Sequence, residues 1–454
     1  MIRLAITNNM AKSLKNHFLQ YGLIEQGAFC LVHKGRGHNG ERLTVSGIIL
    51  PSVQAWEIQS EYNLRPSAQW ISSAISQAIR ERAGLLFVHS HPNKNFPLGF
   101  SPSDKIAFDS LACTIAPILD GPFGAVVAHP NGWSGVLWAG NNTISVGRIA
   151  AIGRTLRFLS PLPSTSRNPL DDRQSDALGV VHNRLRNLCV AVVGCGGLGS
   201  PIAEQLVRMG VNELIIIDND LLDTPSNIRR VFGSKSSDLK AKPPLSKVDV
   251  VGGYLRGLEL GVKICQVKGD VRTERVFRHL LDADIVLMGT DTHGSRAIVN
   301  ELPSKYLTPV IDVGVRVGAK NDNRLSNLVA DIRILTPETP CLWCRNAISA
   351  DTVRAENLSP REHSQLVREG YVVHGIGEPE PSVTALTVLG SGLATCALLA
   401  ALADEGEVAP SGYWIDGLFG DSRETEPKQP KMDCRCRMNI GYGDDMSPPF
   451  IEGS

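Results

Sequence analysis

The stretch Cys189-Val-Ala-Val-Val-Gly-Cys-Gly-Gly-Leu-Gly199 decides the fold of the second half of the chain. Its apolar run, residues 189–193, predicts a buried strand, and the glycine turn that follows leads into a helix over residues 201–209. Another strand, residues 213–218, comes next, which completes the βαβ unit of a Rossmann-like fold. Because glycine backbone lets a phosphate approach amide groups at a helix N-terminus, the turn supplies candidate nucleotide-binding residues: Gly194, Gly196, Gly197 and Gly199.

The strand pattern changes between the two halves of the chain. Further apolar strands at residues 263–267, 285–288 and 310–315 extend a mainly parallel sheet, and a last strand at 413–416 precedes a polar tail. In the first half, short β-like runs alternate with helical stretches at residues 67–83 and 103–116; the runs cover residues 28–32, 43–50, 84–89, 124–128 and 135–138. The sequence therefore predicts an α/β protein whose N-terminal domain has a mostly antiparallel sheet.

A segment rich in Pro and Ser, residues 161–169, separates these halves and has the composition of a linker. We expect an N-terminal domain over residues 1–160 and a linker over 161–170. A Rossmann-like domain then covers 171–410, and the last strand and polar tail cover 411–454.

Composition narrows the partners and the compartment. The 46 basic residues balance 46 acidic ones, so no global field draws the chain to nucleic acid or anionic lipid. The first residues lack the pattern of a secretory signal, which predicts a cytoplasmic protein. The apolar stretch 385–403 is interrupted by Gly, Ser and Thr, which favours a buried or subunit-packing helix over a membrane span.

The N-terminal half contains a candidate metal site. His89 and His91 are one residue apart at a strand end, so both imidazoles can face one ion, and Asp104 follows after a loop. Two nitrogens and one carboxylate leave a tetrahedral position for water, which is typical of a catalytic zinc site. Such a site needs a carboxylate base nearby.

These residues resemble the JAMM (JAB/MPN-plus) metalloproteases, whose signature is His-x-His-Pro, a loop, and Ser-x-x-Asp, with a glutamate on an earlier strand. The resemblance implies that Glu25 is the general base on a zinc-bound water and that Ser101 hydrogen-bonds the tetrahedral intermediate. The loop between His91 and Asp104 is two residues longer than usual in the family, which affects the position of Ser101. The alternative is a member of the fold that binds ubiquitin-like proteins without cutting them.

Polar residues after the glycine turn favour ATP over a dinucleotide. Asp218 and Asp220 end the second strand, where an acidic side chain can hold ribose hydroxyls. Downstream come two cations for a polyphosphate, Arg230 and Lys247, and a carboxylate for Mg²⁺, Asp291, which a hydride-transferring enzyme does not need. The polar Asn227 lies in the same segment as Arg230.

Together these motifs resemble the ThiF/MoeB family, the adenylation domain shared with ubiquitin-activating enzymes, over roughly residues 171–403. The resemblance implies that Asp218 holds the ribose, that Asn227, Arg230 and Lys247 hold the phosphates, and that Asp291 holds Mg²⁺. It also implies that Arg173 reaches the triphosphate of a neighbouring subunit in a homodimer. Lys242 is a rival for the role of Lys247.

The ten cysteines include two pairs with metal-ligand spacing. Cys341 and Cys344 resemble the first half of the family's structural zinc knuckle, and Cys434 and Cys436, one residue apart, are candidates for the second half. Unliganded thiols are the alternative. The other six cysteines are expected in the core.

The fate of the adenylate stays open. Between residues 345 and 393 there is no cysteine, and the next, Cys396, lies in an apolar helix where a core role is expected. A thioester relay from that loop is therefore not favoured. Direct transfer to a sulfur donor or a partner's nucleophile is one alternative, and a loop hydroxyl, Ser359 or Ser364, is another.

The sequence thus predicts a bifunctional enzyme. One half uses ATP and Mg²⁺ to adenylate the C-terminal glycine of a ubiquitin-like protein, and the other uses zinc to cleave its precursors or isopeptide conjugates, with a conjugating-enzyme-like protein as a further partner. The first alternative is activation and maturation of a sulfur carrier for a thiolated metabolite. The second is a non-catalytic scaffold that binds ubiquitin-like proteins.

Overall fold

The computed structural model describes residues 1–96, 98–140, 142–164, 168–319, 324–358, 361–362, 365, 368, 382–403, 410–424 and 430–452. The chain divides into two compact units. Unit 1 comprises Met1–Leu162, Ser304–Leu307 and Met438–Ser447, and unit 2 comprises Pro163–Pro303, Thr308–Arg437 and Pro448–Ser454. Ser359 and Ser364 lie outside the described residues.

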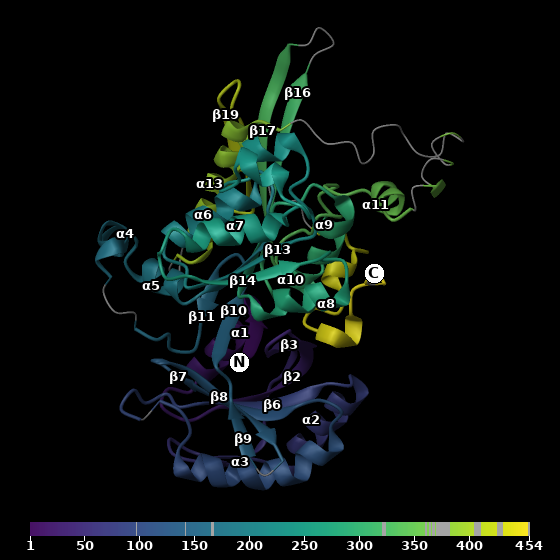
Figure 1. Ribbon diagram of the computed structural model, residues 1–454. Helices are drawn as coiled ribbons and strands as arrows, with labels where there is room; N and C mark the ends of the chain where they lie inside the picture. The colour runs from purple at the N-terminus through teal and green to yellow at the C-terminus, as the bar shows by residue number, and fades with distance from the viewer. Residues whose placement is uncertain are drawn as a thin grey trace. The chain divides into compact units, whose positions relative to one another are not determined.

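Unit 1 is built on a nine-stranded mixed sheet with the order β11-β10-β1-β3-β2-β6-β7-β8-β9 (Figure 1). Strand β1 pairs in parallel with β10 and β3, and β6 pairs in parallel with β7, while the other neighbours are antiparallel. The strands are β1 (Ile2–Thr7), β2 (Gly27–Arg36), β3 (Glu41–Ile49), β6 (Gly84–Ser90), β7 (Phe123–His129), β8 (Gly132–Ala139), β9 (Asn142–Ser145), β10 (Arg148–Ile152) and β11 (Leu156–Phe158). A separate hairpin joins β4 (Trp56–Gln59) to β5 (Leu64–Pro66).

Helices cover both faces of this sheet. Successive residues of a strand point to opposite faces, and Cys30 of β2 packs in the cluster that contains α1 (Asn8–Leu19), whereas Leu31 packs with α2 (Ala68–Arg80) and α3 (Pro102–Ile115). Figure 1 shows α2 and α3 on the side of the sheet away from α1. Both α2 and α3 begin at a serine cap, Ser67 and Ser101, which fixes where each helix starts.

A segment from the far end of the chain completes unit 1. Asp445 lies with Oδ2 2.5 Å from Nδ1 of the buried His33 on β2, and the Tyr442 ring stacks on the His33 ring at 4.4 Å between centroids. Gly443 lies so close to β2 that a Cβ would come 2.3 Å from the Lys34 carbonyl oxygen. The prediction that these residues belong to a polar tail after the last strand is wrong, because contacts across some 400 positions leave no local pattern in the sequence.

Unit 2 contains an eight-stranded sheet with the order β14-β13-β12-β15-β16-β17-β18-β19. The first five strands are parallel and the last three run antiparallel to their neighbours, so this half has the α/β, Rossmann-like fold that the glycine turn predicts. The strands are β12 (Cys189–Val193), β13 (Glu213–Asp218), β14 (Lys263–Lys268), β15 (Ile285–Met288), β16 (Val310–Ala319), β17 (Leu325–Leu335), β18 (Gly412–Asp416) and β19 (Asp421–Glu424). Its helices are α4 (Asp172–Leu178), α5 (Val180–Arg186), α6 (Gly199–Arg208), α7 (Lys247–Arg256), α8 (Glu274–Phe277), α9 (His293–Val299), α10 (Leu302–Lys305, which runs into unit 1), α11 (Ala350–Glu356) and α13 (Thr384–Ala401).

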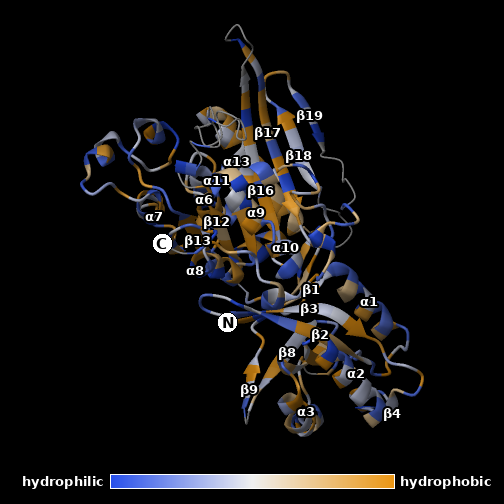
Figure 2. Ribbon diagram, turned by 90° about the vertical axis from the view of Figure 1, so that its right-hand side faces the viewer, coloured by the Kyte–Doolittle hydropathy of each residue, from blue (hydrophilic) through white to orange (hydrophobic). Residues whose placement is uncertain are grey.

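The central strands of unit 2 are covered on both faces. Every residue of β12 and of β15 is buried, and Figure 2 shows the apolar colouring of β12 and β13. Helix α13 contacts α6, β16 and β17. By length and composition α13 is the one helix in the described part of the chain that could cross a bilayer, and half of it is buried within the protein.

The cysteines outside the two pairs are less uniform than expected. Cys30, Cys189 and Cys195 are buried, but Cys113, Cys265 and Cys396 are exposed, so the expected core role is wrong for these three. Cys396 shares the outer face of α13 with partly exposed apolar residues such as Val388. Because α13 is apolar around its whole circumference, its sequence could not tell which face is buried.

Candidate active sites

The glycine turn of unit 2 leaves room for a ligand on one side and none on the other. A Cβ on Gly199 would lie 1.6 Å from the Gly194 carbonyl oxygen, so α6 can start this close to the strand only with glycine there. Gly194 has a φ of +91°, which favours glycine. A Cβ on Gly196, by contrast, would meet nothing within 4 Å. The turn is therefore bare backbone facing open space, as a phosphate-binding turn requires.

Asp218 holds the shape of this turn. Its carboxylate accepts hydrogen bonds from the Cys195 amide at 2.5 Å and from the Asp220 amide at 2.7 Å. Burial raises the pKa of the Asp218 carboxyl, while the nearby Lys247 ammonium acts in the opposite direction. The end of β13 and the turn after β12 are thus joined by one half-buried carboxylate.

Lys247 lies beside the same strand end. It is the first residue of α7, and its Nζ donates to Oδ2 of Asp220 at 2.6 Å. The rival lysine, Lys242, is exposed on the segment before α7. The geometry therefore brings Lys247, and not Lys242, to the two aspartates.

Arg230 and Asn227 approach the turn from another side. Arg230 donates to Oδ1 of the buried Asn227 at 2.9 Å, and the Arg230 Cβ lies 3.4 Å from where a Cβ on Gly197 would be. Asn227 lies on the short helical turn Pro225–Arg229, and Arg230 directly follows that turn.

Asp291 reaches this edge of the sheet through β15. Gly289, directly after β15, lies against the turn, since a Cβ on Gly194 would come 3.0 Å from the Gly289 carbonyl oxygen. Asp291 follows two residues later with an exposed side chain, which suits a ligand for Mg²⁺. Arg173 lies on α4. Its predicted contact is with the triphosphate of a second subunit, so its role stays a prediction.

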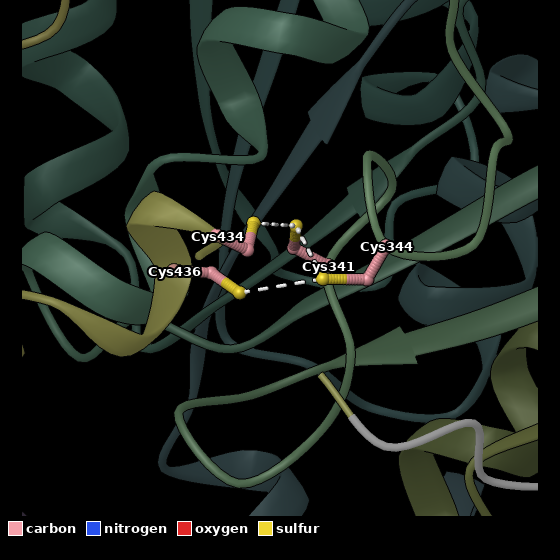
Figure 3. Close-up of side chains that lie close together, drawn as sticks. All are labelled: Cys341, Cys344, Cys434 and Cys436. Carbon is pink, nitrogen blue, oxygen red and sulfur yellow. Dashed lines mark hydrogen bonds between the residues drawn. The ribbon is translucent and has the colours of Figure 1, made fainter. Parts of the chain in front are cut away.

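The four cysteines of the two pairs converge in unit 2 (Figure 3). Sγ of Cys341 lies 3.7 Å from that of Cys344 and 3.5 Å from that of Cys434, and Cys344 lies 3.7 Å from Cys436. A tetrahedron with Zn–S bonds of about 2.3 Å has edges of about 3.8 Å, so the thiols fit one zinc ion. Cys434 and Cys436 flank the start of a short helical turn, Arg435–Arg437, which turns both sulfurs inward despite the single residue between them.

A second ligand group lies in unit 1. Nε2 of His89 is 3.2 Å from Nε2 of His91, and Asp104 places Oδ1 3.5 Å from the first and Oδ2 3.3 Å from the second. Zinc bonds of about 2.05 Å to nitrogen and oxygen imply tetrahedral edges of about 3.3 Å, so these three side chains fit a zinc ion. Burial opposes ionisation of Asp104, but hydrogen bonds to His89 and His91 outweigh it and hold its pKa well below the ordinary range.

Glu25 lies next to this group. It is buried, just before β2, with Oε1 3.7 Å from Nε2 of His91. Strand β2 pairs Gly27 with His89, and this register carries Glu25 to the level of the second histidine. Burial raises the pKa of Glu25 to about 7, against the influence of His91. A carboxyl with that pKa can both take and return a proton near neutral pH.

Ser101 has a definite structural task. It caps α3: its Oγ accepts from the Asp104 amide at 3.1 Å, while Asp104 accepts from the Ser101 amide at 2.7 Å. This reciprocal capping box orients the Asp104 carboxylate. The resemblance gave Ser101 a role toward the substrate and did not predict this one.

Comparison with known proteins identifies the second half of the chain. A model described as the ThiF family matches residues 173–436, which is more than half of the chain. The chain belongs to the ThiF family. The match includes the glycine turn, Asp218, Lys247, Asp291 and the four paired cysteines, and it leaves the histidines of unit 1 outside.

Curated relatives of this ThiF-family chain match over part of their length. The SAMP-activating enzyme E1 of Haloferax volcanii is 28% identical over 160 residues, which are 35% of this chain and 56% of that protein. The sulfur carrier protein ThiS adenylyltransferase of Bacillus subtilis is 29% identical over 161 residues, 36% of this chain and 44% of that protein. Ubiquitin-like modifier-activating enzyme 5 of Aedes aegypti is 28% identical over 207 residues, 42% of this chain and 47% of that protein. The chain spans about half the length of the curated relatives it matches.

Proposed function

We propose that this ThiF-family chain uses ATP to adenylate the C-terminal glycine of a ubiquitin-like or sulfur-carrier protein. The observation that carries the proposal is the meeting of the glycine turn, the Lys247–Asp220 pair and the segment before Asp291 at one edge of the parallel sheet. Ligands of such folds bind at the carboxyl ends of the strands. The names of the relatives, which adenylate or activate proteins of this kind, support the same reaction.

In this reaction a carboxylate oxygen of the tail attacks the α-phosphorus of ATP. The bond from that phosphorus to the bridging oxygen breaks, and pyrophosphate leaves with the electron pair, which produces an acyl adenylate. The chain's task is to position the reactants and neutralise charge. A Mg²⁺ ion held by Asp291 supplies positive charge at the phosphates when it is bound.

The two cationic side chains of the site are each hydrogen-bonded to a residue of the same chain. Lys247 donates to Asp220 and Arg230 donates to Asn227, so neither side chain is free to swing away from the turn. A polyphosphate that enters takes these hydrogen bonds over, and Asp218 keeps the ribose side of the turn in shape. Side chains held in this way lose less conformational entropy when ATP binds.

ATP–pyrophosphate exchange with candidate proteins that end in glycine tests the proposal. We expect exchange that requires the partner protein, disappears in Asp291→Ala and survives in Glu25→Ala. The pair Lys247→Ala and Lys242→Ala serves as a matched control, since only the first removes a cation from the turn. Folded wild-type protein that shows no exchange with any partner contradicts the proposal and favours the scaffold.

The subsequent acceptor defines two versions of the proposal. In the first, a nucleophile of a conjugating-enzyme-like protein attacks the adenylate carbonyl and AMP leaves. In the second, a sulfide-level donor attacks the same carbon, AMP leaves, and the tail ends in a thiocarboxylate for biosynthesis of a thiolated metabolite. Mass spectrometry of the tail after reaction separates the versions. We also propose a homodimer through unit 2, because the family resemblance implies that Arg173 of α4 reaches the triphosphate of a neighbouring subunit.

For unit 1 we propose a JAMM-type zinc isopeptidase that acts on the same tail. The supporting observation is a set of three ligands at zinc distances with the buried Glu25 carboxylate 3.7 Å from one of them. A zinc ion held by His89, His91 and Asp104 would supply positive charge to polarise the scissile carbonyl and to make a nearby water more acidic. Glu25 takes the proton of the attacking water and passes it to the amine as the carbon–nitrogen bond breaks.

Cleavage of a ubiquitin-like protein with a residue or a lysine-linked protein beyond its final glycine tests this second activity. We expect zinc-loaded wild-type protein to release the extension and His91→Ala to lose both zinc from unit 1 and cleavage. Zinc binding without cleavage of any such substrate would leave unit 1 as a binding module.

A further inference from the structure

Helix α11 is fastened at both ends to the first residues of α9. At its start, the Ser349 amide donates to Nδ1 of His293 at 3.0 Å. At its end, the Glu356 carboxylate accepts from the His293 amide at 2.9 Å and from the Gly294 amide at 2.7 Å. These are the first amides of α9, and Asp291 lies two residues before them. One carboxylate therefore fixes the backbone that carries the proposed Mg²⁺ ligand.

Arg272 ties the same helix end to a second strand of the nucleotide edge. It donates to Oδ1 of Asn357, which follows α11, at 2.8 Å, and it binds the Asp270 carboxylate at 2.7 Å. Asp270 follows Gly269, whose amide donates to the Asp218 carbonyl at 3.1 Å. The end of α11 is thus joined to the loops after both β14 and β15.

Gly294 makes this arrangement possible. A Cβ there would lie 3.2 Å from Oε2 of Glu356 and 3.2 Å from Cδ of Arg272, which is tighter than ordinary contact. Both the pairing with Asp270 and the charge of Glu356 raise the pKa of Arg272. The carboxylate, the guanidinium and the helix start are therefore packed around one glycine.

Helix α11 packs against α9 with Ala355 buried, and open space lies beside this contact. A mostly apolar cavity of about 470 Å³ lies between α9, α11 and the cysteine pairs, with Ile298 and Val353 among its walls. The polar contacts at both ends of α11 therefore add to its packing on α9 and fix its position beside this open space.

We propose that Glu356 is a positioning residue for Mg²⁺-dependent ATP binding: its carboxylate holds the start of α9 so that Asp291 faces the phosphates. This inference rests on the proposed adenylation. Without the carboxylate, the two amides of α9 are satisfied by water in varied geometries, and Asp291 must be ordered each time Mg·ATP binds. The cost falls on the affinity for Mg·ATP and less on the rate of the bound complex.

Calorimetric titration with Mg·ATP, and with ATP in EDTA, tests the proposal on Glu356→Gln. The amide group of Gln turns a donor toward one of the α9 amides, so we expect Mg·ATP affinity to fall roughly tenfold. Affinity for metal-free ATP stays unchanged. Where wild type catalyses exchange, KM for Mg·ATP rises by the same factor while kcat changes little.

Controls separate positioning from folding. Asp351→Asn makes the same chemical change on the exposed side of α11 and is expected to match wild type. Glu356→Ala, which lets water reach the amides, is expected to lose less affinity than Glu356→Gln and covers the case in which the Gln variant does not fold. Equal Mg·ATP affinity in wild type and Glu356→Gln, or equal losses with and without Mg²⁺, overturns the positioning role even if wild type adenylates its partner. A wild type that binds no ATP refutes both this inference and the proposed function.

Discussion

The two groups of metal-ligand side chains differ in how many ligands they bring together. In unit 2, the four thiols lie within 4.8 Å of one another, with three sulfur pairs 3.5 to 3.7 Å apart, which is enough ligands to fill a tetrahedron. In unit 1, three side chains lie 3.2 to 3.5 Å apart, and the remaining direction faces Glu25. A filled tetrahedron stabilises a fold, whereas an unfilled one with a buried carboxylate beside it can activate water. On the proposal made above, the two groups would therefore differ in chemistry because they differ in the number of ligands.

Removal of one thiol from the filled group should have the largest effect. We expect Cys436→Ser to reduce bound zinc by one ion per chain and to destabilise unit 2 by on the order of several kcal/mol, because zinc binding there is coupled to folding. Zinc analysis and thermal unfolding measure both consequences. Cys265→Ser, which changes an exposed thiol on β14, is the matched control. Full zinc content in Cys436→Ser would mean that the four thiols are not one site.

Glu25→Gln tests the three-ligand group of unit 1 by removing the candidate general base and keeping the metal ligands. The variant keeps all three ligands, so zinc content should stay that of wild type while the rate of tail cleavage falls by about 10²- to 10⁴-fold, the usual contribution of a general base. Glu61→Gln, on the exposed hairpin turn after β4, should cleave normally. Cleavage at the wild-type rate by Glu25→Gln would mean that Glu25 is not the general base of this site.

Ser101→Ala asks whether the capping box or a substrate contact is the main task of that hydroxyl. Loss of the cap frees Asp104, and groups that orient a ligand typically change metal affinity about 10- to 100-fold, so we expect zinc to bind that much more weakly. Competition with a chelator measures the change, and Ser110→Ala, an exposed serine on the same helix, is the control. Unchanged zinc affinity together with slower cleavage would instead favour the contact with the tetrahedral intermediate.

The parts of the fold that sequence predicts well are those specified by neighbouring residues. The glycine turn and the apolar runs around it predicted β12, α6 and β13 within two residues, because strand, turn and helix are encoded in one continuous stretch. Strands β1 and β17 were missed. Strand β1 begins at Ile2 and mixes polar and apolar side chains without a clear strand pattern. Strand β17 follows a polar stretch of sequence that gives no signal for the start of a strand.

The parts that sequence could not predict depend on pairing over long distances. Nothing near Glu356 indicates that it binds amides of α9 more than sixty positions earlier. The convergence of Cys341 with Cys434 was a possibility from spacing alone, and only the path of the chain between them brings the sulfurs together. The same limit applies to Cys396, whose exposure depends on which face of α13 is buried.

The smallest expected effect concerns the distant segment that completes unit 1. Asp445→Ala removes the hydrogen-bond partner of the buried His33, but Asp445 is half exposed, so solvent weakens the pairing and we expect a loss of about 1 kcal/mol. Hydrogen–deuterium exchange of the β2 and β3 amides should then be roughly fivefold faster, since local opening follows the lost free energy. Asp109→Asn, an exposed carboxylate on α3, should leave exchange unchanged.

Because β2 carries the register that sets Glu25 against His91, faster opening of β2 with unaltered zinc affinity would show that the unfilled site is held by its own ligands. Weaker zinc binding in Asp445→Ala would show that the distant segment supports the site through the sheet.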